Sequence, residues 1–106
     1  GGGYDHNWVL NNHSGKLAPA AALYEKSTGR YMEVWTTEPA IQFYCGNFLT
    51  DQVPSKKPGK KLCYRGGLAL ETQHSPDSPN QPAFPSTILR PGAVYKSATE
   101  YRFGVK

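Results

Sequence analysis

Polar side chains suited to a hydroxyl-rich ligand alternate with apolar ones in two stretches of this 106-residue chain. Gln42 and Tyr44 lie in the alternating stretch 41–45, and Glu71 ends a second one at 68–71. A period of two places successive side chains on opposite faces of a strand, so we expect these three polar residues to share one sheet face. Such a face could exchange hydrogen bonds with ligand hydroxyls. The solvent-exposed face of any sheet would carry the same pattern.

Each candidate polar residue also has a purely structural interpretation. Asp5 lies two residues after a run of three glycines, where an aspartate often belongs to a turn. Its two oxygens could instead each accept a charge-assisted hydrogen bond from a hydroxyl. Gln42 offers both a donor and an acceptor, which suits a hydroxyl or a cross-strand amide equally. Glu71 would be a salt-bridged surface glutamate if it were a random residue on a strand.

Histidine and cysteine spacing gives no support for a metal site. His6, His13 and His74 lie far apart, and no two of them are four residues apart. Cys45 and Cys63 lack the spacing of metal ligands and are too few for a disulfide scaffold. We therefore expect no metal, and we expect both cysteines to be buried free thiols.

The charge pattern argues against a polyanion partner. Much of the net charge of +4 comes from four lysines in the stretch 54–61, which is typical of a solvated loop. No aromatic residues are interleaved with these lysines to stack on bases, so we expect no nucleic-acid binding. No apolar run approaches the roughly 18 residues of a membrane span, and no signal peptide opens the chain. We expect no membrane association and a cytoplasmic location.

Strands dominate the expected secondary structure. Ser97–Val105 alternates most clearly, residues 31–37, 41–45 and 68–71 form further strands, and 8–11 and 20–24 are weaker candidates. Glycine and proline, at 11 and 9 residues, are too frequent for long helices. Prolines exclude the run 75–85 from any helix or central strand. The pattern predicts an all-β fold, an antiparallel β-sandwich with a single core.

The expected core combines one face of two strands with the larger aromatic residues. Ile41 and Phe43 form the apolar face of one strand, and Leu68 and Leu70 form that of another. Trp8, Trp35 and Tyr44 could stack on a ligand, but core packing is the role we expect for them.

Four stretches of the sequence resemble the aldose 1-epimerase family in order and spacing. They are GGYDHNWVL (residues 2–10), TEPAIQFYCGNF (37–48), LETQHSPDSPNQP (70–82), and FPST with LRPG (84–87 and 89–92). The resemblance covers essentially the whole chain. Because members of the family are considerably longer, residues 1–106 resemble the C-terminal portion of such a domain. Truncation of a longer polypeptide and a natural short relative both remain open.

The resemblance implies an enzyme that interconverts the α and β anomers of aldohexoses such as galactose and glucose, without a cofactor. By motif position, Glu71 corresponds to the catalytic base, and Asp5 and Gln42 correspond to contacts of the sugar hydroxyls. Two family histidines, one of them the general acid, and a substrate-binding arginine belong to the part upstream of this chain. None of His6, His13 and His74 lies in those histidine motifs.

The sequence departs from the family at three positions near the implied site. Ala40 replaces a common glycine, Cys45 a usual threonine and Ser75 a frequent aromatic residue. None of these positions carries the chemistry itself. The departures therefore bear on which aldose is preferred more than on the type of reaction.

Ring opening needs a base for the O1 proton and an acid for the ring oxygen, and each positioned group contributes about 10² to 10⁴ in rate. This chain would supply only the base. We therefore expect two partners, the sugar and the N-terminal part of the same protein that this chain lacks. We expect the isolated chain to be inactive. The alternative is a non-catalytic sugar-binding or structural fragment that lacks the general acid.

Overall fold

The structure, a computed structural model, describes residues 2–11 and 14–106. Its elements are β1 (Asp5–Val9), β2 (Ala18–Glu25), β3 (Arg30–Thr36), β4 (Ala40–Tyr44), β5 (Ala69–Gln73), the short 3₁₀ turn η1 (Ser78–Asn80) and β6 (Thr99–Val105). Within the described residues the fold is therefore all-β, as predicted. No helix there is long and apolar enough to cross a membrane.

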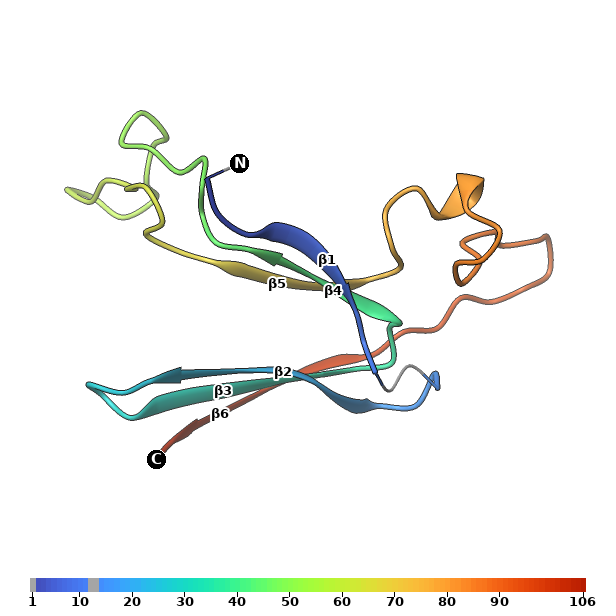
Figure 1. The fold of residues 1–106 in the computed structure, drawn as a ribbon. Coiled ribbons are helices and arrows are strands. Elements are labelled where there is room, and N and C mark those ends of the chain that lie inside the picture. The colour runs from blue at the N-terminus through green and yellow to red at the C-terminus, as the bar shows by residue number, and fades with distance from the viewer. Residues whose placement is uncertain (1, 12–13) are drawn as a thin grey trace.

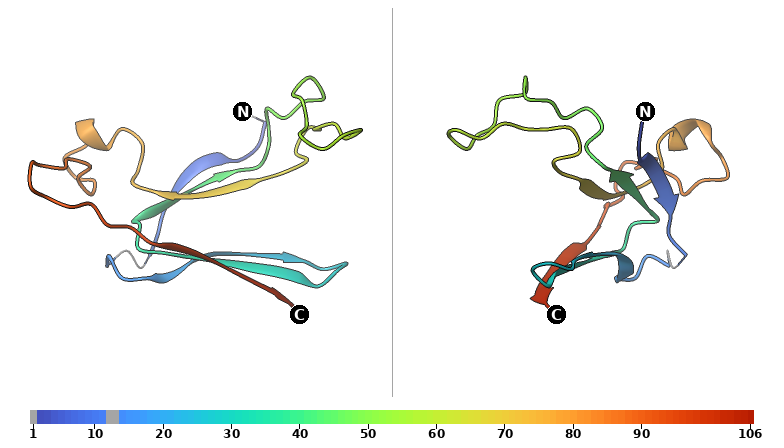
Figure 2. Two further views of the ribbon diagram at one scale, coloured as in Figure 1. Left: turned by 180° about the vertical axis from the view of Figure 1, so that it is seen from behind. Right: turned by 60° about the vertical axis from the view of Figure 1, so that its left-hand side comes forward.

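The six strands form two antiparallel sheets of three strands each. One sheet has the order β1-β4-β5 and the other the order β2-β3-β6. The sheets face each other as two layers, lie closest where β3 turns into β4, and diverge toward the opposite end (Figures 1 and 2). This arrangement matches the predicted sandwich architecture.

The buried core is small and lies where the sheets converge. Its fully or nearly buried apolar side chains are Ala18, Val34, Ala40 and Ile41. Toward the diverging end, apolar side chains on the same face of β6 as Tyr101 stay exposed. Phe103 and Val105 retain 78% and 77% of their accessible surface. The open end therefore leaves the apolar face of one sheet largely uncovered.

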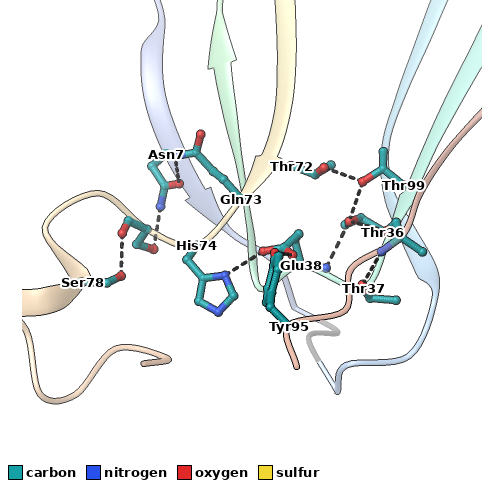
Figure 3. Close-up of polar contacts among 12 residues, drawn as sticks. Asn7, Thr36, Thr37, Glu38, Thr72, Gln73, His74, Ser78, Tyr95 and Thr99 are labelled. Atoms are coloured by element: carbon teal, nitrogen blue, oxygen red, sulfur yellow. Dashed lines mark hydrogen bonds and ion pairs between the residues drawn. The ribbon is translucent and has the colours of Figure 1, made fainter. Parts of the chain in front are cut away.

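Threonine hydroxyls join the two sheets at their closed end. Thr72 of β5 lies 2.6 Å from Thr99 of β6, which in turn lies 3.1 Å from Thr36 of β3, measured between Oγ1 atoms. Figure 3 shows this chain of hydroxyls crossing between the layers. Because Thr36 is almost completely buried, its hydroxyl needs such partners.

Several predicted strands are found with shifted boundaries. The predicted strand 97–105 begins at Thr99, and the weak candidate 8–11 is instead β1, which begins at Asp5 because residues 5–9 pair with β4 along their length. The proline-rich run 75–85 contains no strand, as predicted, and its regular structure is η1. The lysine-rich stretch is an exposed loop except for the half-buried Ser55, with one isolated bridge between Pro54 and Lys61.

Four burial predictions are wrong. Cys63 is an exposed thiol, while Cys45 is half-buried and hydrogen bonds to Asn47 at 3.1 Å. Leu68 precedes β5 and is exposed, and Trp8 keeps 51% of its surface. Leu68 lies where the sheets diverge, whereas Trp8 is paired with the buried Ile41 but lies on the edge strand β1.

Trp35 also lies outside the predicted core. In β3 the inward positions are held by Val34 and Thr36, so the alternation directs Trp35 to the outer face. There the Arg102 guanidinium lies 3.8 Å from the centre of the Trp35 ring. This cation–π contact covers the ring in place of core packing.

Candidate functional site

A row of three polar residues crosses the sheet β1-β4-β5. Asn7 of β1 is paired with Gln42 of β4, and Gln42 is paired on its other side with Glu71 of β5. Residues directly opposite each other in antiparallel strands project on the same face. The prediction that Gln42 and Glu71 share one sheet face is thus confirmed, and the pairing brings Asn7 into the same row.

Asp5 joins this row through a hydrogen bond. The Gln42 Nε2 donates to Asp5 Oδ1 at 2.8 Å. Because a carboxylate only accepts hydrogen bonds, this contact fixes which end of the Gln42 amide faces Asp5. Asp5 is the first residue of β1 and is exposed, as is Glu71. The three residues singled out from the sequence therefore come together on one face.

The other end of the Gln42 amide is unsatisfied. The Gln42 Oε1 is buried and finds no hydrogen-bond donor among the described residues. A buried acceptor without a donor is uncommon in folded proteins, and a bound ligand or an ordered water can supply the donor. The row therefore contains an acceptor that a donor from outside this part of the chain would satisfy.

An aromatic pair borders the polar row. Tyr44 is paired with Asp5 and so projects on the same face, which corrects its predicted core role. Its ring stacks on that of Phe48, with centroids 6.1 Å apart and an interplanar angle of 15°. The Phe48 N–H donates to the Tyr44 hydroxyl at 2.8 Å, and Phe48 is 67% exposed. Polar groups beside an exposed aromatic ring match a ligand with hydroxyls and apolar C–H faces.

A second polar cluster lies at the end of β5 and has no counterpart in the sequence prediction. Glu38, in the turn between β3 and β4, is only 5% exposed. Its carboxylate is 2.8 Å from Nδ1 of His74 and accepts a hydrogen bond from the Tyr95 hydroxyl (Figure 3). These residues are 36 and 57 positions from Glu38, so no local pattern relates them.

Hydrogen bonding controls the ionisation of this cluster. Burial acts to raise the pKa of Glu38, but the hydrogen bonds from Ser97, Tyr95 and His74 outweigh it and lower that pKa below its ordinary value. The same Glu38 contact raises the pKa of Tyr95. Beside the cluster is a cavity of about 510 Å³, whose further lining includes residues 86–89. Through Tyr95, the ionised Glu38 therefore holds the long connection between β5 and β6.

The histidines are dispersed in the structure. His6 packs edge-on against Tyr4 with ring centroids 5.6 Å apart, His74 is bound to Glu38, and His13 lies outside the described residues. Across residues 2–11 and 14–106, no three His, Cys, Asp or Glu side chains are grouped so that they could hold a metal ion.

Comparison with known proteins gives a consistent set of relatives. Residues 1–102 match the aldose 1-epimerase family. The chain is 44% identical over 103 residues to the galactose mutarotase of Mus musculus and 42% identical over 103 residues to that of Homo sapiens. It is also 42% identical over 103 residues to the aldose 1-epimerase of Escherichia coli strain K12. These matches cover 97%, 97% and 95% of this chain, but it spans only 30%, 30% and 29% of the relatives.

Proposed function

Because the chain belongs to the aldose 1-epimerase family, we propose that it is the C-terminal portion of a domain that interconverts the anomers of an aldohexose such as galactose or glucose. The observation that carries this proposal is the pairing of Gln42 with Glu71 on one sheet face, with Asp5 bonded to Gln42. A carboxylate positioned beside hydroxyl-binding groups is what the base of ring opening requires.

Glu71 takes the role of the base in this proposal. Its carboxylate removes the proton from O1 of the sugar, the O1 electron pair forms the C1 carbonyl, and the bond between C1 and the ring oxygen breaks. The ring oxygen takes a proton from an acid. Rotation about C1–C2 and closure on the opposite face of the carbonyl, with both protons returned, give the other anomer. Asp5 and Gln42 hold the sugar hydroxyls during these steps.

The acid comes, in this proposal, from the part of the protein that this chain does not include. His6 projects on the opposite sheet face from Glu71, because its neighbour Asn7 is in the polar row, and His74 is bound to Glu38. Neither histidine is therefore placed to serve Glu71. The exposed Phe103 and Val105 offer an apolar surface that the rest of a longer domain would cover. The chain spans about 30% of the length of its curated relatives, which is consistent with such a missing part. We place the reaction in the cytoplasm.

Polarimetry of freshly dissolved α-galactose and α-glucose tests the proposal. We expect the protein that carries this chain within a complete domain to accelerate the change in optical rotation, and the 106-residue chain alone to leave the spontaneous rate unchanged. Adding the remainder of the domain to the isolated chain should restore activity. A complete-domain protein that binds sugar without accelerating the change would instead identify a non-catalytic binding protein.

A further inference from the structure

Asn7 connects β1 to the far end of β5. Its Nδ2 donates to the Ser75 Oγ at 2.9 Å, and its Oδ1 accepts from the Gln73 Nε2 at 3.5 Å (Figure 3). The two strands are not neighbours, because β4 lies between them in the sheet. The side chain of Asn7 therefore ties together the two outer strands of this sheet.

The residue of β4 at this crossing is small. Ala40 is paired with Val9 of β1 on one side and with Gln73 of β5 on the other, and it is completely buried. A longer side chain at this position would project into the path that Asn7 takes toward β5. Ala40 thus leaves room for the hydrogen bonds that join Asn7 to Gln73 and Ser75.

The end of β5 is held from the opposite side as well. His74, immediately before Ser75, is bound to Glu38 in the turn between β3 and β4. Successive residues thus anchor the strand end to two different parts of the fold, one contact at His74 and the other at Ser75. Glu71 lies in the middle of the same short strand, a few residues before His74 and Ser75.

We propose that Asn7 and Ser75 are positioning residues, which hold Glu71 of β5 and Asp5 of β1 at the spacing needed to engage one sugar molecule. This inference rests on the proposed function. Asp5 and Glu71 lie on strands that each hydrogen bond only to β4 within the described residues, so a direct tie between those strands limits their independent movement. A displacement of about 1 Å between a catalytic group and its substrate can lower a rate by about 10².

The tie is specific to the residue at position 75. Serine supplies the acceptor for Asn7 in a small side chain, whereas an aromatic residue has no hydroxyl on Cβ to accept the same bond. The hydrogen bond is therefore inferred for this chain, which has serine at position 75.

Substitutions in the complete-domain protein test this inference through kcat and KM measured by polarimetry. We expect Ser75→Ala to lower kcat about 10-fold, because Glu71 is displaced, and to change KM less than about 2-fold, because Asp5 and Gln42 are intact. Ser75→Thr keeps the hydroxyl and should restore most of kcat. The matched control is Ser55→Ala, which removes a serine hydroxyl that accepts from the Lys57 N–H at 3.1 Å in the lysine-rich loop. This control should leave both constants unchanged.

A double-mutant cycle separates a shared tie from two independent effects. Asn7→Ala should reproduce the kcat loss of Ser75→Ala, and the double variant should be no slower than either single variant, because all three lack the same contact. Additive losses of kcat in the double variant, or kcat within 2-fold of the parent in a folded Ser75→Ala protein, would overturn this inference. Neither result would contradict the proposed function. A parent protein without mutarotase activity would overturn the proposed function and this inference with it.

Discussion

The carboxylate of Glu38 lies 2.8 Å from Nδ1 of His74 and so joins the turn between β3 and β4 to the end of β5. The Tyr95 hydroxyl donates to the other oxygen of the same carboxylate. Removing one partner from a nearly buried, hydrogen-bonded charge is destabilising, because the remaining groups are left without their bonds. This contact fixes the strand that carries Glu71 and makes the closed end of the fold sensitive to pH.

The first prediction concerns acid stability. The hydrogen bonds from Ser97, Tyr95 and His74 lower the pKa of Glu38 in the folded protein below the value of 4.5 that it has when unfolded. The ionised group therefore stabilises the fold above about pH 4.5, and this contribution is lost as pH falls through the lowered folded-state pKa. We expect Glu38→Gln to reduce the free energy of unfolding at pH 7 by about 1–3 kcal/mol.

Urea unfolding of both proteins between pH 7 and pH 3 measures this difference. The difference in the free energy of unfolding between the parent and Glu38→Gln should narrow as the pH falls. Glu100→Gln is the control, because Glu100 forms an exposed ion pair with Arg102 at 2.8 Å, and it should cost less than about 1 kcal/mol. A difference in the free energy of unfolding that is constant with pH would show that the charge of Glu38 does not stabilise the fold.

The second prediction concerns substrate binding. Asp5→Asn keeps the shape of the side chain but removes the charge that receives the sugar hydroxyls. Losing a charge-assisted hydrogen bond of about 1.5–3 kcal/mol should raise KM about 10-fold or more, with kcat within a few-fold of the parent. Polarimetric rates over a range of galactose concentrations give both constants. An unchanged KM would remove Asp5 from the binding site.

The third prediction concerns the uncovered apolar face. Phe103 is 78% exposed in this chain, so its truncation here removes little buried surface. If the remainder of the domain covers that face, Phe103→Ala in the complete-domain protein should lower the free energy of unfolding by about 3 kcal/mol or more. Val94→Ala, at an exposed loop residue, is the control and should stay within about 0.5 kcal/mol. Equal, small effects would mean that β6 borders solvent in the whole protein.

Periodicity is sufficient to predict that Gln42 and Glu71 share a sheet face, but it does not predict that Asn7 lies beside them. Each of the two lies on the polar side of an alternating stretch, and antiparallel pairing aligns them directly. Alternation alone does not decide which side of β3 faces inward, because both sides carry large apolar side chains, with Met32 and Val34 on one and Trp35 on the other. The outward position of Trp35 therefore does not follow from the sequence.

Contacts between distant segments could not be predicted from the sequence. Glu38, His74 and Tyr95 meet only because the turn after β3, the end of β5 and the approach to β6 converge in space. The tie from Asn7 to Ser75 likewise depends on the order β1-β4-β5, which follows from pairing and not from composition. Exposure of Leu68 depends on the divergence of the sheets, and Cys63 lies in the long loop between β4 and β5. No local pattern encodes either position.

The most direct test of the account is the mutarotation rate of a Glu71→Gln variant in the complete-domain protein. The amide is nearly isosteric with the carboxylate but cannot accept the O1 proton, so we predict a loss of about 10² or more in kcat with an unchanged circular dichroism spectrum. Polarimetry of freshly dissolved α-glucose reports the rate. A variant that retains activity within a few-fold of the parent would contradict the assignment of Glu71 as the base.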